Sequence, residues 1–350
     1  MHCIRSIYLL LFGALACCVA EHVNAQIPDL EAQALGRIYQ ATGGPNWDNT
    51  TQQPPTNPWI SPGRGTECTW YGVTCNADST HVIGINLSFN NLIGTLPLPD
   101  PAHVAVGDLT DLTYLQTFNV GYNELSGTIP PLTGLTNLIG FNVNSNQLTG
   151  PIPSLAGLTN LLYFDVGGNY YLSGSIPPLT GLTNLQIFVA DYNQLTGSIP
   201  SLAGLTQLHS FFVFKNQLTG SIPPLTGVTN LRSFFASYNQ LTGLIPSLGG
   251  LTNLVHFDIR QNRLSGPIPS LAGLTNLAAF NVGNNLLTGA VPPAPSSLQL
   301  GDSSLCSNPL DTTPSADPAI DAAWDQATGL TPWWSAFKSQ CDILFRDSFE

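Results

Sequence analysis

The amino-acid sequence predicts an α/β solenoid in which short parallel strands stack into one concave sheet. The first observation is an internal repeat: the segment LTGLTNLIGFNVNSNQLTGPIP, residues 132–153, returns with a step of 23 residues, and of 24 where Tyr170–Tyr171 adds one. A fixed period of this length is typical of solenoids, in which each unit stacks on its neighbours. The second observation is one Asn that marks every copy, at Asn123, Asn146, Asn169, Asn193, Asn216, Asn239, Asn262 and Asn285.

The composition excludes two broad classes of protein. The 350 residues are 43% hydrophobic and only 9% charged, which is far too apolar for a disordered chain. The formal net charge of −12 argues against nucleic acid or an anionic membrane as the main partner. One repeat array can absorb this length, so we expect a single solenoid with a cap at each end.

The chain divides into four segments. Residues 1–25 are typical of a secretory signal peptide, because the basic Arg5 precedes an apolar stretch and a small-residue cleavage site ends at Ala25. That stretch is shorter than a membrane span, which needs about 20 apolar residues. We therefore expect a secreted, extracellular chain without a transmembrane segment. In a bacterium the chain could lie in the cell envelope or periplasm. Lipidation at Cys17 is the alternative to cleavage at Ala25. The other segments are an N-terminal cap at 26–81, the repeat array of about nine to ten coils at 82–300, and a C-terminal cap and tail at 301–350.

Four cysteines remain once the signal peptide is removed: Cys68, Cys75, Cys306 and Cys341. An even number in an exported chain indicates two disulfides. The repeat array separates the first two cysteines from the last two. Among the three possible connectivities we therefore expect local pairing, Cys68 with Cys75 and Cys306 with Cys341.

The segment before the repeats is predicted to be a cap with one amphipathic helix. Within residues 28–41 apolar side chains recur at helical spacing, and Gly43-Gly44 ends the pattern. Trp47 and Trp70 are interpreted as packing residues, because the end coil of a solenoid exposes apolar core that a cap must cover. The apolar positions of the helix are Leu30, Ala34, Leu35, Ile38 and Tyr39.

The copies share the pattern L-x-x-L-x-x-F-x-V-x-x-N-x-L-x-G-x-I-P, and the tail Leu-x-Gly-x-Ile-Pro is its most specific part. Together with Asn46-Trp47 and the Cys-x-Trp-x-Gly-Val-x-Cys run, this pattern resembles plant-type leucine-rich-repeat proteins, which also occur among bacterial secreted proteins. The resemblance covers most of the mature chain and extends to receptor ectodomains and polygalacturonase-inhibiting proteins. It implies a right-handed curved superhelix with a parallel concave sheet and disulfide-bonded caps at both ends.

Each recurring position of one copy has an expected structural role. Leu138, Phe141 and Val143 should point inward from a short strand, because side chains alternate along it. Asn146 should bond backbone groups of the turn and stack on its equivalents as an Asn ladder. Gly150 permits a tight backbone path.

The segment after the repeats is predicted to close the array. Leu298-Gln299-Leu300 is a candidate last strand, and short helices are expected near 319–328 and 333–339. Trp324, Trp333 and Trp334 should cover the last coil, with carbohydrate stacking as the alternative. The tail at 343–350 is assigned no role.

The sequence contains no recognisable catalytic or metal-binding motif. The histidines His81, His103, His209 and His256 show no metal-ligand spacing, and no nucleophile elbow or phosphate loop occurs. We therefore expect a protein that is not an enzyme, with no cofactor and no metal.

The variable positions of the repeat predict a binding surface. The residues that flank the inward Phe and Val should face the concave side, because side chains alternate along a strand. In the middle coils these positions combine aromatic and aliphatic residues with a charged border, as in a binding hot spot. Aromatic residues also simply suit strands, but a cluster in adjacent coils favours a ligand. The predicted ligand-binding residues are Tyr163, Ile187, Val189, Asp191, Tyr192, Phe212, Phe214, Lys215, Phe235, Tyr238, His256, Asp258 and Arg260.

We interpret the chain as a monomeric binding protein whose concave face recognises another protein, such as a secreted hydrolase or a surface protein. Glycan or cell-wall binding and adhesion are the alternatives. Asn49 and Asn86 fit the N-glycosylation pattern, which matters only if the source glycosylates. Threonines form a second regular column of the repeat, for which we expect a purely structural role, with ice binding as the alternative. The column consists of Thr136, Thr159, Thr183, Thr206, Thr229, Thr252 and Thr275.

Overall fold

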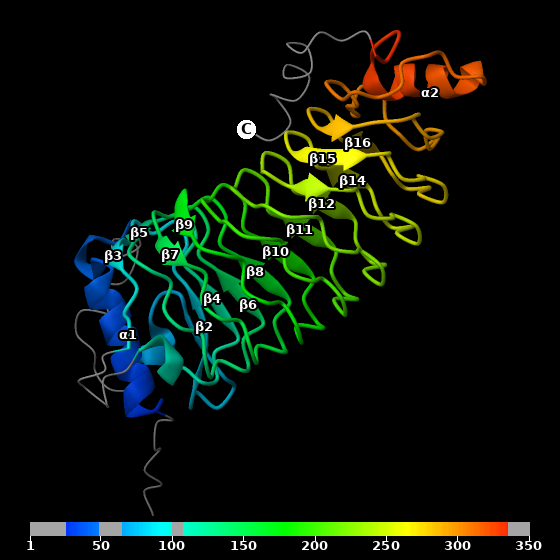
Figure 1. Ribbon diagram of the computed structural model, residues 1–350. Coiled ribbons are helices and arrows are strands. Elements are labelled where there is room, and N and C mark those ends of the chain that lie inside the picture. Colours follow the sequence, from blue (N-terminus) through cyan, green and yellow to red (C-terminus); the bar gives the residue numbers. More distant parts are fainter. Residues whose placement is uncertain (1–25, 49–64, 100–107, 335–350) are drawn as a thin grey trace, which may run out of the picture.

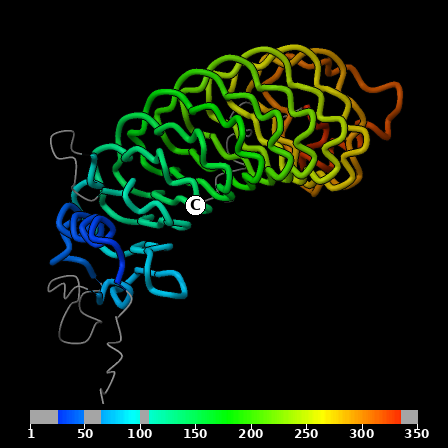
Figure 2. The backbone as a smooth tube through the Cα atoms, turned by 90° about the horizontal axis from the view of Figure 1, so that it is seen from below, coloured from blue at the N-terminus to red at the C-terminus, as the bar shows by residue number. Residues whose placement is uncertain are grey.

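The structure, a computed structural model, describes residues 26–48, 65–99 and 108–334. The described chain is an elongated, curved solenoid whose coils follow one another in chain order, with a cap at each end (Figure 1, Figure 2). A ten-stranded sheet runs along the rod in the order β1-β2-β4-β6-β8-β10-β11-β12-β14-β16. β1 is antiparallel to β2, and the remaining neighbours are parallel. The predicted parallel sheet is confirmed.

Nearly every strand of the main sheet has three residues, because each coil contributes only the short segment around its inward Phe. The strands are β1 (Val73–Cys75), β2 (Val82–Asn86), β4 (Thr117–Asn119), β6 (Gly140–Asn142), β8 (Tyr163–Asp165), β10 (Ile187–Val189), β11 (Ser210–Phe212), β12 (Ser233–Phe235), β14 (His256–Asp258) and β16 (Ala279–Asn281).

Three smaller sheets lie beside the main one, with orders β3-β5, β7-β9 and β13-β15-β17. Their strands contain the Leu-x-Gly part of the repeat: β3 (Ile93–Thr95), β5 (Glu124–Ser126), β7 (Thr149–Pro151), β9 (Tyr171–Ser173), β13 (Thr242–Gly243), β15 (Arg263–Gly266) and β17 (Leu286–Leu287). Gly150 of this motif has a φ of 74°, a left-handed conformation that glycine adopts at little cost. This confirms the tight backbone path expected there.

The α-helices of the described residues, α1 (Asp29–Ala41) and α2 (Pro318–Thr328), belong to the two caps. The coils between them return through turns and short 3₁₀ segments such as Leu109–Asp111. The array is therefore a solenoid of short strands with its α-helices in the two caps, and the predicted solenoid with a parallel sheet is confirmed. The 23-residue repeat is short, and its recurring Pro and Gly positions interrupt the segment in which a helix could form. Neither cap helix is long and apolar enough to cross a membrane.

The core is built on a column of stacked phenylalanine rings, one from each coil. Neighbouring rings in the column have centroids 5.3–5.7 Å apart and planes within 12–18° of parallel. The rings are fully buried between leucine layers, as are Leu138, Phe141 and Val143 of the coil considered above. The column consists of Phe118, Phe141, Phe164, Phe188, Phe211, Phe234, Phe257 and Phe280.

The predicted Asn ladder is confirmed. Asn216 shows its pattern: Oδ1 accepts a hydrogen bond of 2.9 Å from the backbone N–H of Leu195 in the preceding coil. The Nδ2 group donates to the carbonyl oxygens of Ala190, Val213 and Phe214. Each Asn therefore satisfies buried backbone groups of two coils at once and joins them.

The ladder continues past the predicted end of the array. Asn308 donates to the carbonyl oxygens of Val282 and Leu305 and accepts from Leu287 N–H, as the other ladder residues do. Ser304 forms a parallel bridge with Asn281, so the last strand position is there and not at Leu298–Leu300, which has no strand. The prediction was wrong because the last coil lacks the Phe and Val that mark the other strands.

The N-terminal cap is joined to the array through a buried carboxylate. Glu31 of α1 is 2% exposed. Its Oε2 accepts from Val82 N–H at 2.7 Å, and its Oε1 lies 2.7 Å from His81 Nδ1. Trp47 and Trp70 are buried, as predicted, and the Cys68–Cys75 disulfide is present.

The C-terminal cap covers the end of the phenylalanine column. The ring of Trp324, on α2, is fully buried with its centroid 6.2 Å from that of Phe280, and its indole donates to Pro292 O at 2.8 Å. The predicted helix at 319–328 is confirmed, whereas most of the 333–339 segment lies outside the described residues. Cys306 is disulfide-bonded. Cys341 and the 343–350 tail lie outside the described residues, so the pairing of Cys306 with Cys341 stays a prediction.

Candidate functional site

The concave surface of the main sheet carries the variable positions in straight rows. Parallel pairing puts Tyr163 beside Ile187, and Val189 beside Phe212, which in turn lies beside Phe235. The turn after each strand adds another row, because Tyr192 N–H donates to Phe214 O and Lys215 N–H to Ser237 O in the next coil. Residues 23 or 24 apart in the sequence thus become side-by-side neighbours.

Five of the predicted residues form one continuous aromatic patch, defined here as Tyr192, Phe212, Phe214, Phe235 and Tyr238. The ring of Phe214 contacts Tyr192 edge to face at 5.2 Å and Phe235 at 6.4 Å. Phe212 contacts Phe235 edge to face at 5.0 Å. The three phenylalanines are half-buried against one another, whereas Tyr238 is exposed. The patch is therefore a preassembled surface and not a set of free side chains.

Two cations border the patch on its turn side. Lys215 Nζ donates to the Tyr192 hydroxyl at 2.7 Å and lies 4.1 Å from the centroid of that ring. Arg260 lies farther away, with its guanidinium carbon 5.7 Å from the Tyr238 centroid. Both contacts are cation–π interactions, which hold the tyrosine rings upright at the edge of the sheet.

The turn positions of Tyr192, Lys215 and Tyr238 have left-handed backbones, with φ of 50°, 51° and 55°. Such a conformation costs a bulky residue about 1–2 kcal/mol. Ser145 and Asn284 occupy equivalent turns with φ of 50° and 55°, so the turn itself does not require an aromatic ring or a lysine. The left-handed turn therefore recurs in coils with and without an aromatic side chain, and it does not dictate the large side chains of the patch.

An acidic corner adjoins the patch on its N-terminal side. The Tyr163 hydroxyl donates to Asp165 Oδ2 at 2.6 Å, and the N–H of Gly167 donates to Asp165 Oδ1 at 2.9 Å. Burial raises the pKa of Asp165 even though these hydrogen bonds oppose the rise. Burial also raises the pKa of Asp191 to about 7, and the charge of Asp165 adds to that shift. Asp191 therefore titrates near neutral pH.

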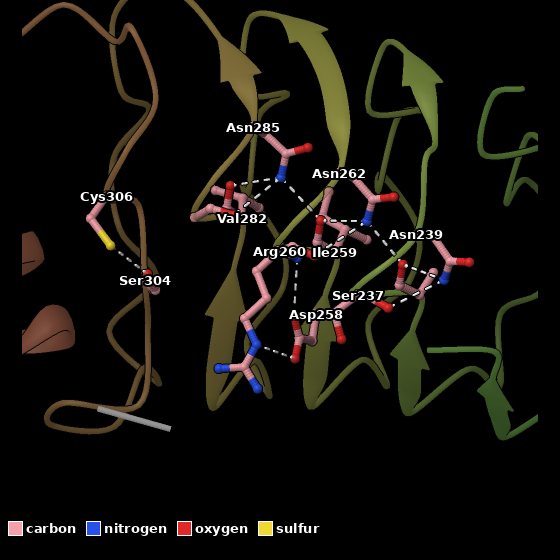
Figure 3. Close-up of polar contacts among 12 residues, drawn as sticks. Ser237, Asn239, Asp258, Ile259, Arg260, Asn262, Val282, Asn285, Ser304 and Cys306 are labelled. Carbon is pink, nitrogen blue, oxygen red and sulfur yellow. Dashed lines mark hydrogen bonds and ion pairs between the residues drawn. The ribbon is translucent and has the colours of Figure 1, made fainter. Parts of the chain in front are cut away.

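The prediction that Asp258 borders the patch as a surface group is corrected by the structure. Its side chain is 3% exposed and forms an ion pair with Arg260, whose Nε lies 3.2 Å from Oδ2 (Figure 3). Oδ1 accepts from the backbone N–H of Arg260. Burial raises the pKa of Asp258 to about 6, and Arg260 opposes that rise. The Asp258 carboxylate at the end of β14 contacts Arg260 in the turn that follows the strand. Alternation of side chains along a strand does not reveal such a contact.

The remaining predicted residues lie on the same face. Ile187 and Val189 are half-buried between the acidic corner and the patch. His256 is exposed, with its ring centroid 6.2 Å from that of Phe235, and burial against its neighbours lowers its pKa. The predicted residues therefore lie on one face of the array, except that the carboxylate of Asp258 is buried beneath it.

Sequence reasoning missed Tyr170, which extends the aromatic surface. It is 60% exposed and its ring contacts Tyr192 edge to face at 6.1 Å. Tyr170 belongs to the coil with the 24-residue step, so it falls outside the alignment of the repeats. The signal that could have identified it is an aromatic insertion in an otherwise regular array.

Metal chemistry has no support from the described ranges, in which no three His, Cys, Asp or Glu side chains gather closely enough to hold an ion. The buried carboxylates of the concave face are occupied by hydrogen bonds and by Arg260.

No family model and no curated protein matches the chain. Several solved structures are similar to the chain. The ectodomain of the plant membrane receptor kinase GASSHO1/SCHENGEN3 from Arabidopsis thaliana, in complex with CASPARIAN STRIP INTEGRITY FACTOR 2, is 29% identical with a TM-score of 0.64; the likeness covers 84% of this chain and 37% of that one. The Arabidopsis receptor kinase HAESA, in complex with the peptide hormone IDA and the co-receptor SERK1, is 26% identical with a TM-score of 0.54, over 81% of this chain and 50% of that one.

A plant ice-binding protein is 27% identical with a TM-score of 0.54, over 78% of this chain and 91% of that one. The chain spans half or less of the two receptor ectodomains, but most of the ice-binding protein. All three likenesses cover more than three quarters of this chain. The repeat sequence, the parallel solenoid and these likenesses make the chain similar to plant-type leucine-rich-repeat proteins.

Proposed function

We propose that the chain is an extracellular, non-enzymatic binding protein whose concave face holds a polypeptide ligand. The observation that carries this proposal is the aromatic patch, in which four rings from adjacent coils contact one another at the surface and Lys215 lies between Tyr192 and the fifth ring, Tyr238. Folding alone does not need them, because the buried phenylalanine column already fills the core. Two structurally similar receptor ectodomains were solved with ligands, one of which is described as a peptide hormone.

The shape and chemistry of the patch favour a polypeptide. Binding hot spots of protein interfaces are rich in Tyr and other large side chains, gathered at the centre of a surface with a polar border. Here the border consists of Asp191, Lys215 and His256. The rings are already packed against one another, so a ligand would order few further side chains on binding.

Selection from a random peptide library displayed on phage tests the proposal, since random sequences sample polypeptide ligands of any composition. Peptides enriched on the immobilised wild-type chain should bind about 30-fold more weakly to the Phe212→Ser/Phe235→Ser variant, because two hot-spot rings contribute about 2 kcal/mol. Phe89→Ser is the matched control, since Phe89 is 66% exposed but contacts Tyr122 and not the patch.

Two results would overturn this function: no enrichment on the wild-type chain, or equal weakening by the control variant. A glycan array probed with the same proteins distinguishes glycan binding from polypeptide binding. Neutral glycans that bind the wild-type chain and are lost with Phe212 and Phe235 would replace the polypeptide as ligand.

Ice binding is a second candidate, favoured by the Thr column and by the likeness to a plant ice-binding protein. All seven threonines of the column are exposed. Their backbone is held in register from coil to coil; Asn230 Nδ2, for example, donates to Thr206 O and Asn253 Nδ2 to Thr229 O. A regular row of hydroxyls and methyl groups at the strand spacing of about 4.8 Å can order water.

Inhibition of ice recrystallisation tests this second candidate. Thr206→Lys/Thr229→Lys should abolish inhibition by the wild-type chain, because two bulky cations break the regular row. Thr196→Lys/Thr219→Lys, at two isolated bridges outside the threonine column, serves as the control that should retain it. A wild-type chain without inhibition excludes the candidate.

A further inference from the structure

Basic residues are concentrated in one part of this acidic chain. Between residues 82 and 300 the sequence has four Lys or Arg, and all of them lie within 215–263, as Lys215, Arg232, Arg260 and Arg263. Residues 192–300 contain these four cations and a single acid, Asp258, for a net charge of +3 in a chain whose formal charge is −12. The aromatic patch lies in the same coils, so the candidate site is locally cationic.

The structure separates these four cations into different roles. Arg260 is ion-paired with the buried Asp258 and folds back onto the sheet (Figure 3). Arg263 begins β15 and therefore belongs to one of the small lateral sheets. Lys215 and Arg232 are both exposed and adjoin the strands that carry the patch. These two are the cations that a ligand on the concave face would meet.

Lys215 and Arg232 lie at opposite ends of the patch. Arg232 directly precedes β12, at the amino end of the strands. Lys215 lies in the turn after β11 and donates its backbone N–H to Ser237 O, at the carboxyl end of the neighbouring strand. Five residues of extended chain separate Arg232 from Ser237, which corresponds to roughly 16 Å. Phe212, Phe214 and Phe235 fill the interval.

We propose that the concave face binds an acidic polypeptide segment, with apolar side chains over the aromatic patch and one carboxylate at each end. This inference rests on the proposed function and specifies its ligand. A segment that runs along the strands in extended form meets Arg232 and Lys215 with acidic residues about four or six positions apart, because an even spacing keeps both side chains on one face. The two cations then fix the register of the ligand, while the rings supply the contact area.

Other charges that face the patch fit this arrangement. Asp191 lies on the side away from Arg232, one coil before Lys215, where it would repel an acidic ligand that extended toward the acidic corner. His256 lies beyond Phe235, and burial lowers its pKa, which disfavours its charged form. The acidic ligand is therefore restricted to the two coils that contain β11 and β12.

A polypeptide fits better than an anionic polysaccharide. A polyuronate or sulfated glycan carries a charge on nearly every sugar, and some of these charges would have to lie over the aromatic rings. Burying an ionised group against an apolar surface without a partner is strongly unfavourable. An acidic peptide can place its charges at the two ends and leave the middle apolar.

Composition of the peptides selected from the random phage library tests the inference. We expect peptides enriched on the wild-type chain to combine large apolar residues with two Asp or Glu residues, about four or six positions apart. Lys215→Glu/Arg232→Glu should bind these peptides about tenfold more weakly, since two attractive border contacts become repulsive. The same variant should enrich basic peptides instead. Arg263→Glu is the matched control and should retain the wild-type selection, because it reverses a charge of the same sign on the lateral side.

The outcomes distinguish this inference from the proposed function. Peptides that depend on Phe212 and Phe235 but show no acidic bias would overturn the inference and leave the function standing. Equal weakening by Arg263→Glu would also overturn it, by showing a nonspecific effect of net charge. Dextran sulfate serves as the polysaccharide probe. One outcome would overturn both the inference and the proposed function: dextran sulfate binds the wild-type chain but not Lys215→Glu/Arg232→Glu, and no peptide is enriched. The surface would then be assigned to polyanionic glycans.

Discussion

Phe211 and Phe212 are adjacent in strand β11 but project to opposite faces of the sheet: Phe211 is fully buried in the stacked column, whereas Phe212 contacts Phe235 on the concave surface. Truncating the two residues should therefore have very different costs. We expect Phe211→Ala to destabilise the fold by about 3–5 kcal/mol, because it leaves a cavity in the core. Phe212→Ala should cost about 0.5–1.5 kcal/mol, the value of one aromatic pair. Chemical denaturation of both variants measures the difference, and equal costs would contradict the observed register.

The Asn ladder supplies a second pair of matched variants. Asn216 makes hydrogen bonds through both ends of its amide, whereas Asn193 Oδ1 is buried without a partner among the described residues. The coil that precedes Asn193 is the one that contains the additional residue at Tyr170–Tyr171. We expect Asn216→Ala to cost about 1 kcal/mol more than Asn193→Ala, the value of the additional hydrogen bond.

Thermal unfolding of the two Asn variants in the same buffer decides this prediction. Equal destabilisation would mean that the Oδ1 bond contributes nothing to the stability of the array. An unchanged melting temperature for Asn216→Ala would contradict the ladder as a stabilising element.

Asp191 should make the stability of the array depend on pH. Its pKa in the folded chain is about 7, raised by burial above the ordinary value of 3.8, so the folded state retains a proton that the unfolded state has lost. Stability from this group is fully present below pH 3.8 and is lost as the pH rises toward 7. Asp191→Asn removes the titrating group and should raise the melting temperature at pH 7.5 relative to the wild-type chain.

The same substitution at about pH 3.5 is its own control, because the wild-type carboxyl is then protonated in both states. We expect the melting temperatures of the two proteins to agree there. A difference of the same size at both pH values would show that the amide acts through packing and not through the lost proton.

Glu31 should fix the N-terminal cap to the array. Glu31→Ala leaves the buried N–H of Val82 without an acceptor, which costs about 1–3 kcal/mol. Glu31→Gln retains an acceptor oxygen and should cost less. Amide hydrogen exchange at Val82 measures this locally: we expect faster exchange in the alanine variant, with the amides of β11 unaffected. Uniformly faster exchange along the array would contradict a local role for this contact.

The sequence alone determined the array and the direction of its side chains. The 23-residue repeat required coils that contact their neighbours, and alternation along each strand required Phe211 to point inward when Phe212 points outward. The Asn ladder could also be predicted from the sequence, because one Asn recurs at the same position of every copy of the repeat. These features are local or periodic, so a single copy of the repeat contains the information for all of them.

Only the tertiary structure decided what depends on neighbouring coils. The repeat pattern placed Asp165 and Asp258 on the concave face, but the rings and backbone groups of adjacent coils bury both carboxylates and raise their pKa values. Asn308 joined the ladder although its coil lacks the repeat signature, because the preceding coil offers it the same carbonyl groups. Arg232 and Lys215 came to lie at opposite ends of one aromatic patch because parallel stacking turns a separation of 17 residues in the chain into neighbouring strands. Burial, pairing and spacing of charges are properties of the stack, and no single copy of the repeat contains them.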